Sequence, residues 1–431
     1  MRSNRTIVSV GLRGIMVLCG AAAASATLFA QSITIGLSGD ITAFDPHYHN
    51  VGPNNSAAAH VFERLVAMDE QQRLKPGLAL SWKPIDDLNW EFKLRRGVKW
   101  HDGSDFTADD VIATLDRVPK VPNSPSSFST YVRPIKAIKA TDPYTLLITT
   151  EKPHPLLPND LSTVYIIARK VAAGASTEDF NSGKAAIGTG PYQLVRFAKG
   201  DRLELARNDA WWGGKTPWEK ATLRILTNDP ARVAALLSGD IQALENAPTA
   251  DMARLKSDRN LALARVGSNR LIYLHLDSSR DVSPFVTDKQ GRPLAKNPLK
   301  DPRVRKALSL ALNRDAIVSR VMEGEAVAAG QPLPDGYPGT SKSLKPDKFD
   351  AAQAKKLLAE AGYPDGFGIT IHAPNNRYVN DEQIAQAVAQ MLTRAGIATK
   401  VDAMPSSVYF TRATKLEFSL MLLGWSAGSG E

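Results

Sequence analysis

The segment WEFKLRRGVKWHDG, residues 90–103, carries the clearest structural signal in the sequence. Trp90, Phe92 and Leu94 alternate with charged residues, which is the period of a strand with one buried face. The Asp-Gly pair at the end of the segment favours a turn. Thr107, followed by two acidic residues, is typical of a helix N-terminus, because the hydroxyl caps the first turn and the carboxylates meet the helix dipole. The segment therefore predicts a strand, a turn and a helix in close succession.

The same interleaving of strands and helices extends in both directions from this segment. Apolar alternation predicts strands at residues 33–37, 192–196, 203–205, 261–266, 271–276 and 418–423. Helical periodicity, with Asp or Asp-Pro starts and Gly stops, predicts helices at residues 55–68, 230–238, 303–312, 350–361 and 381–395, and another from Asp315. This order favours an α/β fold class, and the 431 residues suffice for two or three domains.

Charge and cysteine content exclude several classes of protein. The 53 Lys and Arg exceed the 44 Asp and Glu, for a net charge of +9, but the basic residues are not clustered. We therefore expect no nucleic-acid partner. The single cysteine, Cys19, falls in a segment that we expect to be removed, so a disulfide framework is not expected.

Residues 1–30 have the pattern of a secretory signal peptide. Arginines precede an apolar run at 14–18, and either Ala24-Ser25-Ala26 or Leu28-Phe29-Ala30 fits a cleavage site. The run is too short for a membrane anchor. Leu18 before Cys19 fits a lipidation site poorly, so we expect a free periplasmic protein.

A search for catalytic motifs gives little. The sequence has no H-E-x-x-H and no cysteine cluster, so no metal site is predicted. Gly214-Lys215-Thr216 resembles the end of a P-loop, but Asp209 stands where the first glycine would be required. We therefore predict a binding protein without enzymatic activity or cofactor. A secreted hydrolase remains the alternative from another class, and it would need a nucleophile and base brought together by the fold.

The segment at 90–103, with its continuation through Val111, resembles the signature of the family 5 extracellular solute-binding proteins, which include peptide-, nickel- and glutathione-binding importer subunits. Further matches to the family follow in order: Phe44-Asp45-Pro46-His47, Pro76-Gly77-Leu78-Ala79, Gly188-Thr189-Gly190-Pro191-Tyr192, Ser238-Gly239-Asp240, Asp301-Pro302-Arg303-Val304-Arg305, Ala359-Glu360-Ala361-Gly362-Tyr363-Pro364 and Gly424-Trp425. The resemblance implies a two-lobed periplasmic binding protein fold of type II, peptide-binding-like, with an inserted β-rich subdomain.

The resemblance also implies a division of the chain. Lobe I would comprise residues 31–55 and 187–268, the inserted subdomain residues 56–186, and lobe II residues 269–431. Members of the family usually continue beyond the Gly-Trp motif, so we expect the C-terminal return to lobe I to be missing from this sequence.

The function that the resemblance implies is capture of a solute by lobe closure. A ligand that touches both lobes shifts the equilibrium towards the closed form. The closed protein, a monomer, would deliver a peptide-like or other polar small solute to an inner-membrane ABC permease with its ATPase subunits. A binder of metal chelates or opine-type compounds is the alternative within the same family.

Arg377 is the foremost candidate ligand-binding residue, together with its neighbours Asn376 and Tyr378. In dipeptide-binding relatives an arginine near this position holds the peptide carboxylate, and a guanidinium fork suits that group. The alternative interpretation is a solvated loop arginine.

The Gly-Trp motif supplies a second group of candidates. Trp425 could pack on the ligand or belong to the core. Dipeptide-binding relatives carry, three residues later, an Asp that pairs with the peptide amine, and here that position is Gly428. Glu431 matches a second acidic position and could replace it. Weaker candidates, for which ordinary surface or packing roles are favoured over ligand contact, are Asp40, Thr42, Tyr48, Tyr131, Arg133 and Tyr273.

Overall fold

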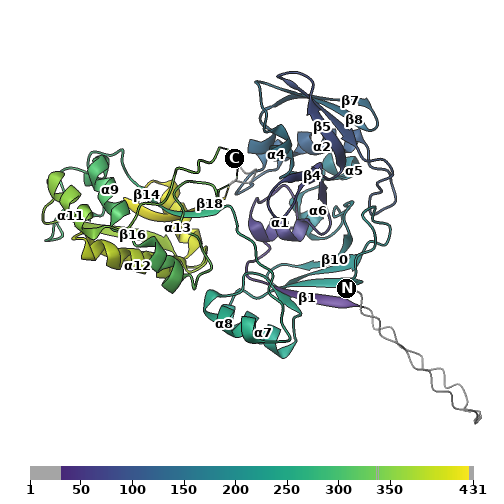
Figure 1. Cartoon of the computed structure of the whole chain (residues 1–431). Coiled ribbons are helices and arrows are strands. Elements are labelled where there is room, and N and C mark those ends of the chain that lie inside the picture. The colour runs from purple at the N-terminus through teal and green to yellow at the C-terminus, as the bar shows by residue number, and fades with distance from the viewer. Residues whose placement is uncertain (1–30, 336, 338, 427–431) are drawn as a thin grey trace, which may run out of the picture.

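The computed structural model describes residues 31–335, 337 and 339–426. They form two bodies, joined by the chain around residues 258–269 (Figure 1). Lobe I with its inserted subdomain precedes this connection, and lobe II follows it. The predicted signal segment, Gly428 and Glu431 lie outside the described residues. Within the described part of the chain, no helix is long and apolar enough to span a membrane.

The sheet of lobe I begins with the first described strand. Its order is β10-β11-β12-β1-β13. β1 is parallel to β12 and to β13, whereas β10, β11 and β12 are antiparallel. The strands and the helices that follow them are β1 (Ser32–Leu37), β10 (Tyr192–Ala198), β11 (Arg202–Arg207), β12 (Lys220–Ile225), β13 (Ala243–Leu244), α7 (Asp229–Ser238), η2 (Thr249–Asp251) and α8 (Met252–Ser257). The hairpin and the helix predicted in this region are confirmed.

The inserted subdomain is built on an antiparallel sheet of order β5-β6-β8-β7. Thr107 caps α2 in a capping box with Asp110, as its position after the predicted strand suggested. The elements are β5 (Ala79–Pro84), β6 (Asn89–Leu94), β7 (Ile135–Asp142), β8 (Thr145–Thr150), α2 (Ala108–Arg117), η1 (Val118–Lys120), α3 (Ser129–Val132), α4 (Leu157–Leu161), α5 (Arg169–Ala172) and α6 (Thr177–Asn181). Shorter elements beside them are α1 (Gly52–Ala58), β2 (Glu63–Arg64), β3 (Val66–Met68), β4 (Leu74–Pro76) and β9 (Tyr165–Ile166).

Lobe II carries a mixed sheet in which β14, β18 and β16 are neighbours, with β15 and β17 on either flank of β16. Both β17 and β18 are parallel to β16, and β14 is antiparallel to β18. The elements are β14 (Arg270–Leu276), β15 (Val286–Thr287), β16 (Gly368–Pro374), β17 (Ala398–Met404), β18 (Leu420–Ser426), η3 (Pro298–Lys300), α9 (Pro302–Leu310), α10 (Arg314–Ala316), the π-helix η4 (Ile317–Val321), α11 (Ala351–Glu360), α12 (Asp381–Arg394) and α13 (Ser406–Thr414).

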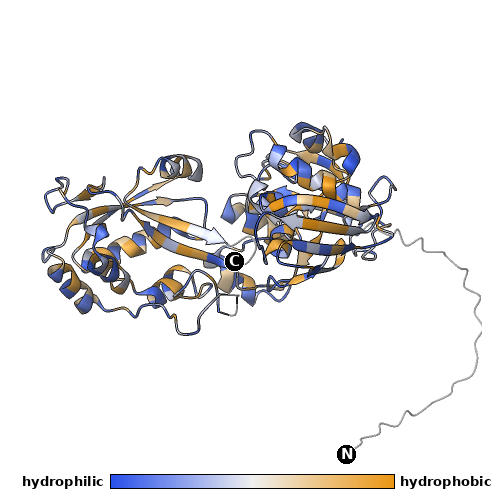
Figure 2. Cartoon of the chain, turned by 90° about the horizontal axis from the view of Figure 1, so that it is seen from above, coloured by the Kyte–Doolittle hydropathy of each residue, from blue (hydrophilic) through white to orange (hydrophobic). Residues whose placement is uncertain are grey.

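The hydrophobic clusters separate the two bodies. One cluster, with Phe92 and Trp100, lies within the inserted subdomain, a second around Phe62 combines subdomain residues with strands of lobe I, and a third around Leu392 lies in lobe II. In Figure 2 the hydrophobic residues concentrate on strands inside each body. Because each body buries its own apolar surface, the bodies can keep their shape when their relative position changes.

Two predictions of secondary structure are wrong. The helix expected at residues 55–68 ends early, because the backbone of β2 pairs with β9 and that of β3 with β4. The strand expected at residues 261–266 is irregular chain, and Val266 is 62% exposed. In both cases long-range pairing, or its absence, overrode the local pattern.

Polar contacts link lobe II to the end of lobe I near the connection. The side-chain amide of Asn380 donates to the Thr249 hydroxyl at 2.7 Å, and Lys256 lies 2.7 Å from the carboxylate of Glu325. Arg265 also approaches Glu325, at 3.3 Å. These contacts fix the approach of the two bodies in this structure.

Candidate functional site

Arg377 and Tyr378 lie in the loop between β16 and α12 of lobe II. One carboxylate oxygen of Asp381 accepts the backbone N–H of both residues, each at 2.9 Å. The Tyr378 hydroxyl donates to the carbonyl of Gly424 on β18 at 3.2 Å. The loop is therefore tied to the carboxyl ends of two parallel strands, which is where α/β sheets commonly bind ligands.

Arg270, which the sequence analysis did not single out, belongs to the same surface. It starts β14 and is paired with Ser426, because β14 runs antiparallel to β18. Its guanidinium carbon lies 5.8 Å from the centroid of the Tyr378 ring, and that of Arg377 lies 5.3 Å from the same centroid. We define the lobe II surface by these three side chains. Trp425 is 68% exposed at the end of β18, but it follows Gly424, which faces Tyr378, so its side chain points to the other face of the sheet. Its part in binding stays a prediction.

The electrostatics of this surface are unbalanced. Among the described residues, neither Arg270 nor Arg377 has an ion pair, and their hydrogen bonds involve only backbone N–H groups. The pKa of Arg270 is lowered, first by partial desolvation and then by the positive charge of Arg377. Both guanidiniums nevertheless remain charged at any physiological pH. The surface can therefore attract and hold an anion.

The lobe I surface consists of a hydrogen-bonded group of polar side chains. The Thr42 hydroxyl lies 2.9 Å from Nδ1 of His49, and the backbone N–H of Thr42 donates to Asn54 at 3.0 Å. The amide of Asn50 donates to the Tyr131 hydroxyl at 3.3 Å. Two residues that the sequence indicated, Thr42 and Tyr131, are thus accompanied by three that it missed.

The two surfaces face one another. The pKa of His49 is lowered, first by burial and second by the positive charge of Arg377, so the guanidinium from lobe II is close enough to act on an imidazole of lobe I. His49 therefore stays neutral at neutral pH and can donate or accept a hydrogen bond. A cationic surface opposite a neutral, hydrogen-bonding surface is suited to a polar, anionic solute.

The model of the bacterial extracellular solute-binding proteins, family 5 (middle region), matches residues 73–431. The chain belongs to this family. Among curated relatives of this family 5 protein is the glutathione-binding protein GsiB of Salmonella choleraesuis, 29% identical over 429 residues, which cover 96% of this chain and 78% of the relative. GsiB of Escherichia coli O1:K1 is also 29% identical, over 95% of this chain and 77% of its own.

Solved structures support the same fold. NikZ from Campylobacter jejuni in complex with Ni(L-His) is 26% identical, with a TM-score of 0.72 over 92% of this chain and 77% of its own. MoaA from A. tumefacien R10 in complex with mannopinic acid is also 26% identical, with a TM-score of 0.68 over 93% and 79%. DppA from Helicobacter pylori, 24% identical, shares the fold with a TM-score of 0.72 over 92% and 79%. The prediction of a two-lobed α/β solute-binding protein is confirmed.

Several predicted residues of this family 5 protein lie apart from the two surfaces or are engaged elsewhere. Asn376 accepts the backbone N–H of Ser406 at 2.8 Å, so its carbonyl oxygen holds the start of α13. Tyr273 is half-buried on β14, and burial followed by Tyr378 raises its pKa. Asp40 and Arg133 are exposed, and no ion pair involves either within the described residues. Their part in binding stays a prediction.

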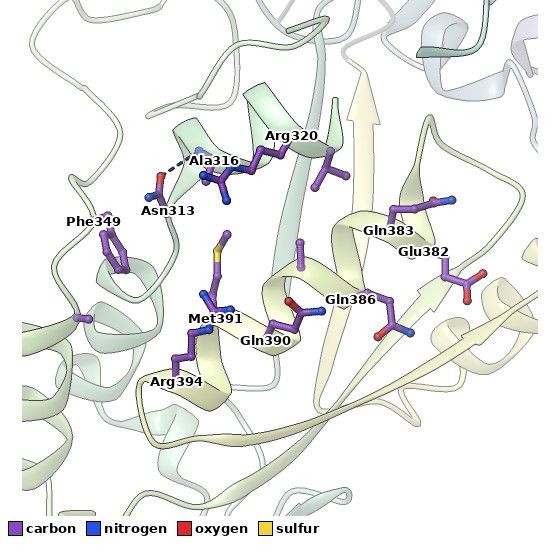
Figure 3. A pocket seen from close by; sticks show the side chains of 13 residues that line it. Asn313, Ala316, Arg320, Phe349, Glu382, Gln383, Gln386, Gln390, Met391 and Arg394 are labelled. Atoms are coloured by element: carbon purple, nitrogen blue, oxygen red, sulfur yellow. Dashed lines mark hydrogen bonds between the residues drawn. The ribbon is translucent and has the colours of Figure 1, made fainter. Parts of the chain in front are cut away.

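A depression of about 760 Å³ lies on lobe II, and neither Arg377 nor Tyr378 is among its lining residues. Figure 3 shows Gln383, Gln386 and Gln390 lining one side of it along α12, with Arg394 at the far end and Arg320 opposite. All its lining residues come from lobe II, so lobe closure would not enclose a ligand there. Nor do the described residues include any group of three or more His, Cys, Asp or Glu side chains placed to hold a metal ion.

Proposed function

We propose that this family 5 protein is the periplasmic solute-capturing subunit of an ABC importer. It binds a peptide-like or other polar small solute between the lobe I surface and the lobe II surface. The observation that carries the proposal is Arg377, a charged side chain without an ion-pair partner in the described chain, whose field reaches His49 of the opposite lobe. The curated relatives support it, because they are named as glutathione-binding proteins.

In this proposal the solute is captured when the two lobes close around it. The lobe II surface offers charge and the lobe I surface offers neutral hydrogen bonds, so a solute that touches both gains more contacts in the closed state. Such a ligand shifts the population towards closure by its difference in affinity for the two states. The inner-membrane permease then receives the closed monomer, and the ATPase subunits supply the energy. The protein itself needs neither cofactor nor chemical step for this task.

The proposal also assigns a role to each segment of the chain. Residues 1–30 direct export to the periplasm, residues 31–55 and 187–268 form lobe I, residues 56–186 form the insertion, and lobe II begins at 269. The connection between the lobes then acts as the hinge.

A second candidate ligand class is an opine or a metal chelate. The solved structures of NikZ with Ni(L-His) and of MoaA with mannopinic acid, each 26% identical, favour it. In that case Arg377 would hold the anionic carrier, since arginine suits carboxylates and does not ligate metals.

The decisive experiment is ligand screening with Arg377→Ala. Thermal unfolding is recorded with peptides, glutathione, opines and metal chelates, because a ligand at a hundred times its dissociation constant adds about 2.7 kcal/mol to stability. For an anionic ligand found in this way, Arg377→Ala should weaken binding about 10- to 100-fold, since a charged hydrogen bond contributes about 1.5–3 kcal/mol. The melting temperature of the empty variant should stay unchanged, because Arg377 is exposed.

Arg394→Ala is the matched control. Arg394 is likewise an exposed arginine of lobe II without an ion pair among the described residues, but it borders the depression in Figure 3. Loss of binding in Arg394→Ala with full binding in Arg377→Ala would move the site to that depression. Turnover of a bound compound would contradict the proposal and favour the hydrolase alternative.

A further inference from the structure

We propose that Arg270 and Arg377 together form a two-arginine site that selects solutes with two anionic groups. This inference rests on the proposed function, because it specifies the class of solute that the lobe II surface takes. The two side chains flank a single ring, that of Tyr378, at 5.8 Å and 5.3 Å from its centroid. Their guanidinium carbons therefore lie no further apart than these two distances combined.

Two like charges at such separation repel one another unless a counter-charge lies between them. Some arginines elsewhere in the described chain have acceptors within the protein, whereas others, such as Arg394, have no ion pair there. Arg232 donates to Asp229 and to two carbonyl oxygens, and Arg280 donates to Asp277 and to the carbonyls of residues 416 and 418. Arg270 and Arg377 have no such acceptor among the described residues, and they differ from other exposed arginines because both approach one ring. A solute with two anionic groups can supply a counter-charge to each of them.

One carboxylate would satisfy one guanidinium fork and leave the other charge unbalanced. A solute with two carboxylates, spaced by the length of a short peptide, can meet both forks. The lobe I surface adds no cation that would compete for them, because His49 is held neutral and its neighbours Thr42, Asn50, Asn54 and Tyr131 carry no charge. Selection for the second negative charge therefore falls to Arg270.

Tyr378 makes this arrangement specific. Its hydroxyl donates to the carbonyl of Gly424 and its backbone N–H donates to Asp381, so the ring that both guanidiniums approach is held in place at two points. Trp425 pairs with Leu271 in the β14–β18 ladder and points to the other face of the sheet, because its neighbour Gly424 is the residue that meets Tyr378. An apolar stem between two carboxylates can therefore pack on the Tyr378 ring while its ends reach the guanidiniums.

The test measures affinities of the full chain for two matched probe pairs. The first pair is glutathione and its glycine amide, and the second is Ala-Glu and Ala-Gln, so that each pair differs by a single negative charge. We expect the wild-type protein to prefer the member of the bound pair with two carboxylates (the dianion) over the member with one (the monoanion) by about tenfold or more. Arg270→Gln should reduce that preference to about twofold or less, mainly by weakening the binding of the dianion. Arg270→Lys should retain part of the preference, because it keeps the charge and loses the fork.

The outcomes separate the inference from the proposed function. Equal binding of dianion and monoanion by the wild type, or an unchanged preference in Arg270→Gln, overturns the two-arginine site while solute capture stands. Failure of all four probes to bind counts against both the dianion and the peptide-like solute. Unchanged melting of the empty Arg270 variants is required for either interpretation, and is expected because Arg270 is exposed.

Discussion

The structure contains arginines in two contrasting environments. Arg117 is buried among partners of its own, whereas Arg270 and Arg377 are exposed on lobe II. Arg117 is buried at the end of α2, with one nitrogen 2.7 Å and the other 3.0 Å from the two carboxylate oxygens of Asp45. It also lies 2.9 Å from Nδ1 of His47, whose other ring nitrogen meets the carbonyl of Tyr165. Every partner of this guanidinium is part of the protein, whereas the pair in lobe II has none in the described chain.

This difference separates an arginine that holds the fold from one that is available to a ligand. Arg117 joins the inserted subdomain to the segment of lobe I that contains Asp45, and the Thr177 hydroxyl adds a further bond to that carboxylate at 2.9 Å. A buried guanidinium that already donates to several acceptors cannot bind a new partner without breaking an existing hydrogen bond. An exposed guanidinium without partners can bind a solute and leave the protein's own contacts unchanged.

The largest expected effect is the loss of stability on replacing Arg117, the buried arginine. Arg117→Met should lower the free energy of unfolding by about 3–5 kcal/mol, because Asp45 would remain buried without its counter-charge. Arg377→Met should change it by no more than about 0.5 kcal/mol, as is usual for exposed positions. Urea unfolding of the two variants measures both values. Losses of similar size in both variants would show that the distinction between the two settings is false.

An effect of intermediate size is expected from acid, which should destabilise the buried group formed by Arg117, Asp45 and His47. Burial, followed by the charge of Arg117, lowers the pKa of His47 from 6.5 to about 4. The unfolded chain therefore takes up a proton below pH 6.5 that the folded protein excludes, and stability falls as the pH drops from 6.5 to about 4. The total loss is on the order of 3 kcal/mol.

The pH prediction has its own control. His47→Asn keeps a side-chain acceptor for Arg117 and removes the titrating ring, so its stability should vary less across this window. The pKa of Asp45 is also lowered, since its hydrogen bond and ion pair with Arg117 outweigh the opposing effect of burial. Its contribution is therefore lost only below pH 3.8, outside the window. Stability curves of wild type and His47→Asn that run parallel from pH 6.5 to 4 would contradict the assignment.

The smallest effect is expected where the lobes meet. Asn380 has a left-handed backbone with φ of 54°, and its amide donates to Thr249 and to the carbonyl of Val321, both at 2.7 Å. Asn380→Gly keeps the backbone and should cost about 1 kcal/mol for the lost bonds. Asn380→Ala should cost about 1–2 kcal/mol more, because alanine is strained in this region. Thermal unfolding of the two variants checks the order, and equal losses would exclude the strain.

Local sequence was sufficient for much of the fold. Thr107 caps its helix, Gly239 ends α7 in the left-handed conformation, and the strand at 90–94 forms with its alternating burial. These features depend on residues within one or two turns of chain, so they can be predicted from the pattern alone. The helix expected at residues 55–68 failed because β2 and β3 pair with chain that comes later in the sequence.

The candidate site was predicted only in part. Arg377 and Thr42 were named as candidates through the family resemblance, and their part in binding stays a prediction. In the structure the charge of Arg377 acts on His49, and His49 contacts Thr42. Asn376 is occupied by a backbone N–H, although its position beside Arg377 suggested a ligand contact. Arg270 was overlooked, because an arginine at the start of a strand carries no local signal of its role.

The sequence by itself determined the family, the order of helices and strands, and an arginine in the loop after β16. The tertiary structure alone decided which charges are satisfied. Arg117 meets Asp45 and His47 because the inserted subdomain folds back on the start of lobe I. Arg270 reaches Tyr378 because β14, the first strand of lobe II in the sequence, pairs with β18, the last strand described. Local patterns are set by neighbours along the chain, whereas the balance of a charge depends on whatever side chains the fold brings within a few ångströms.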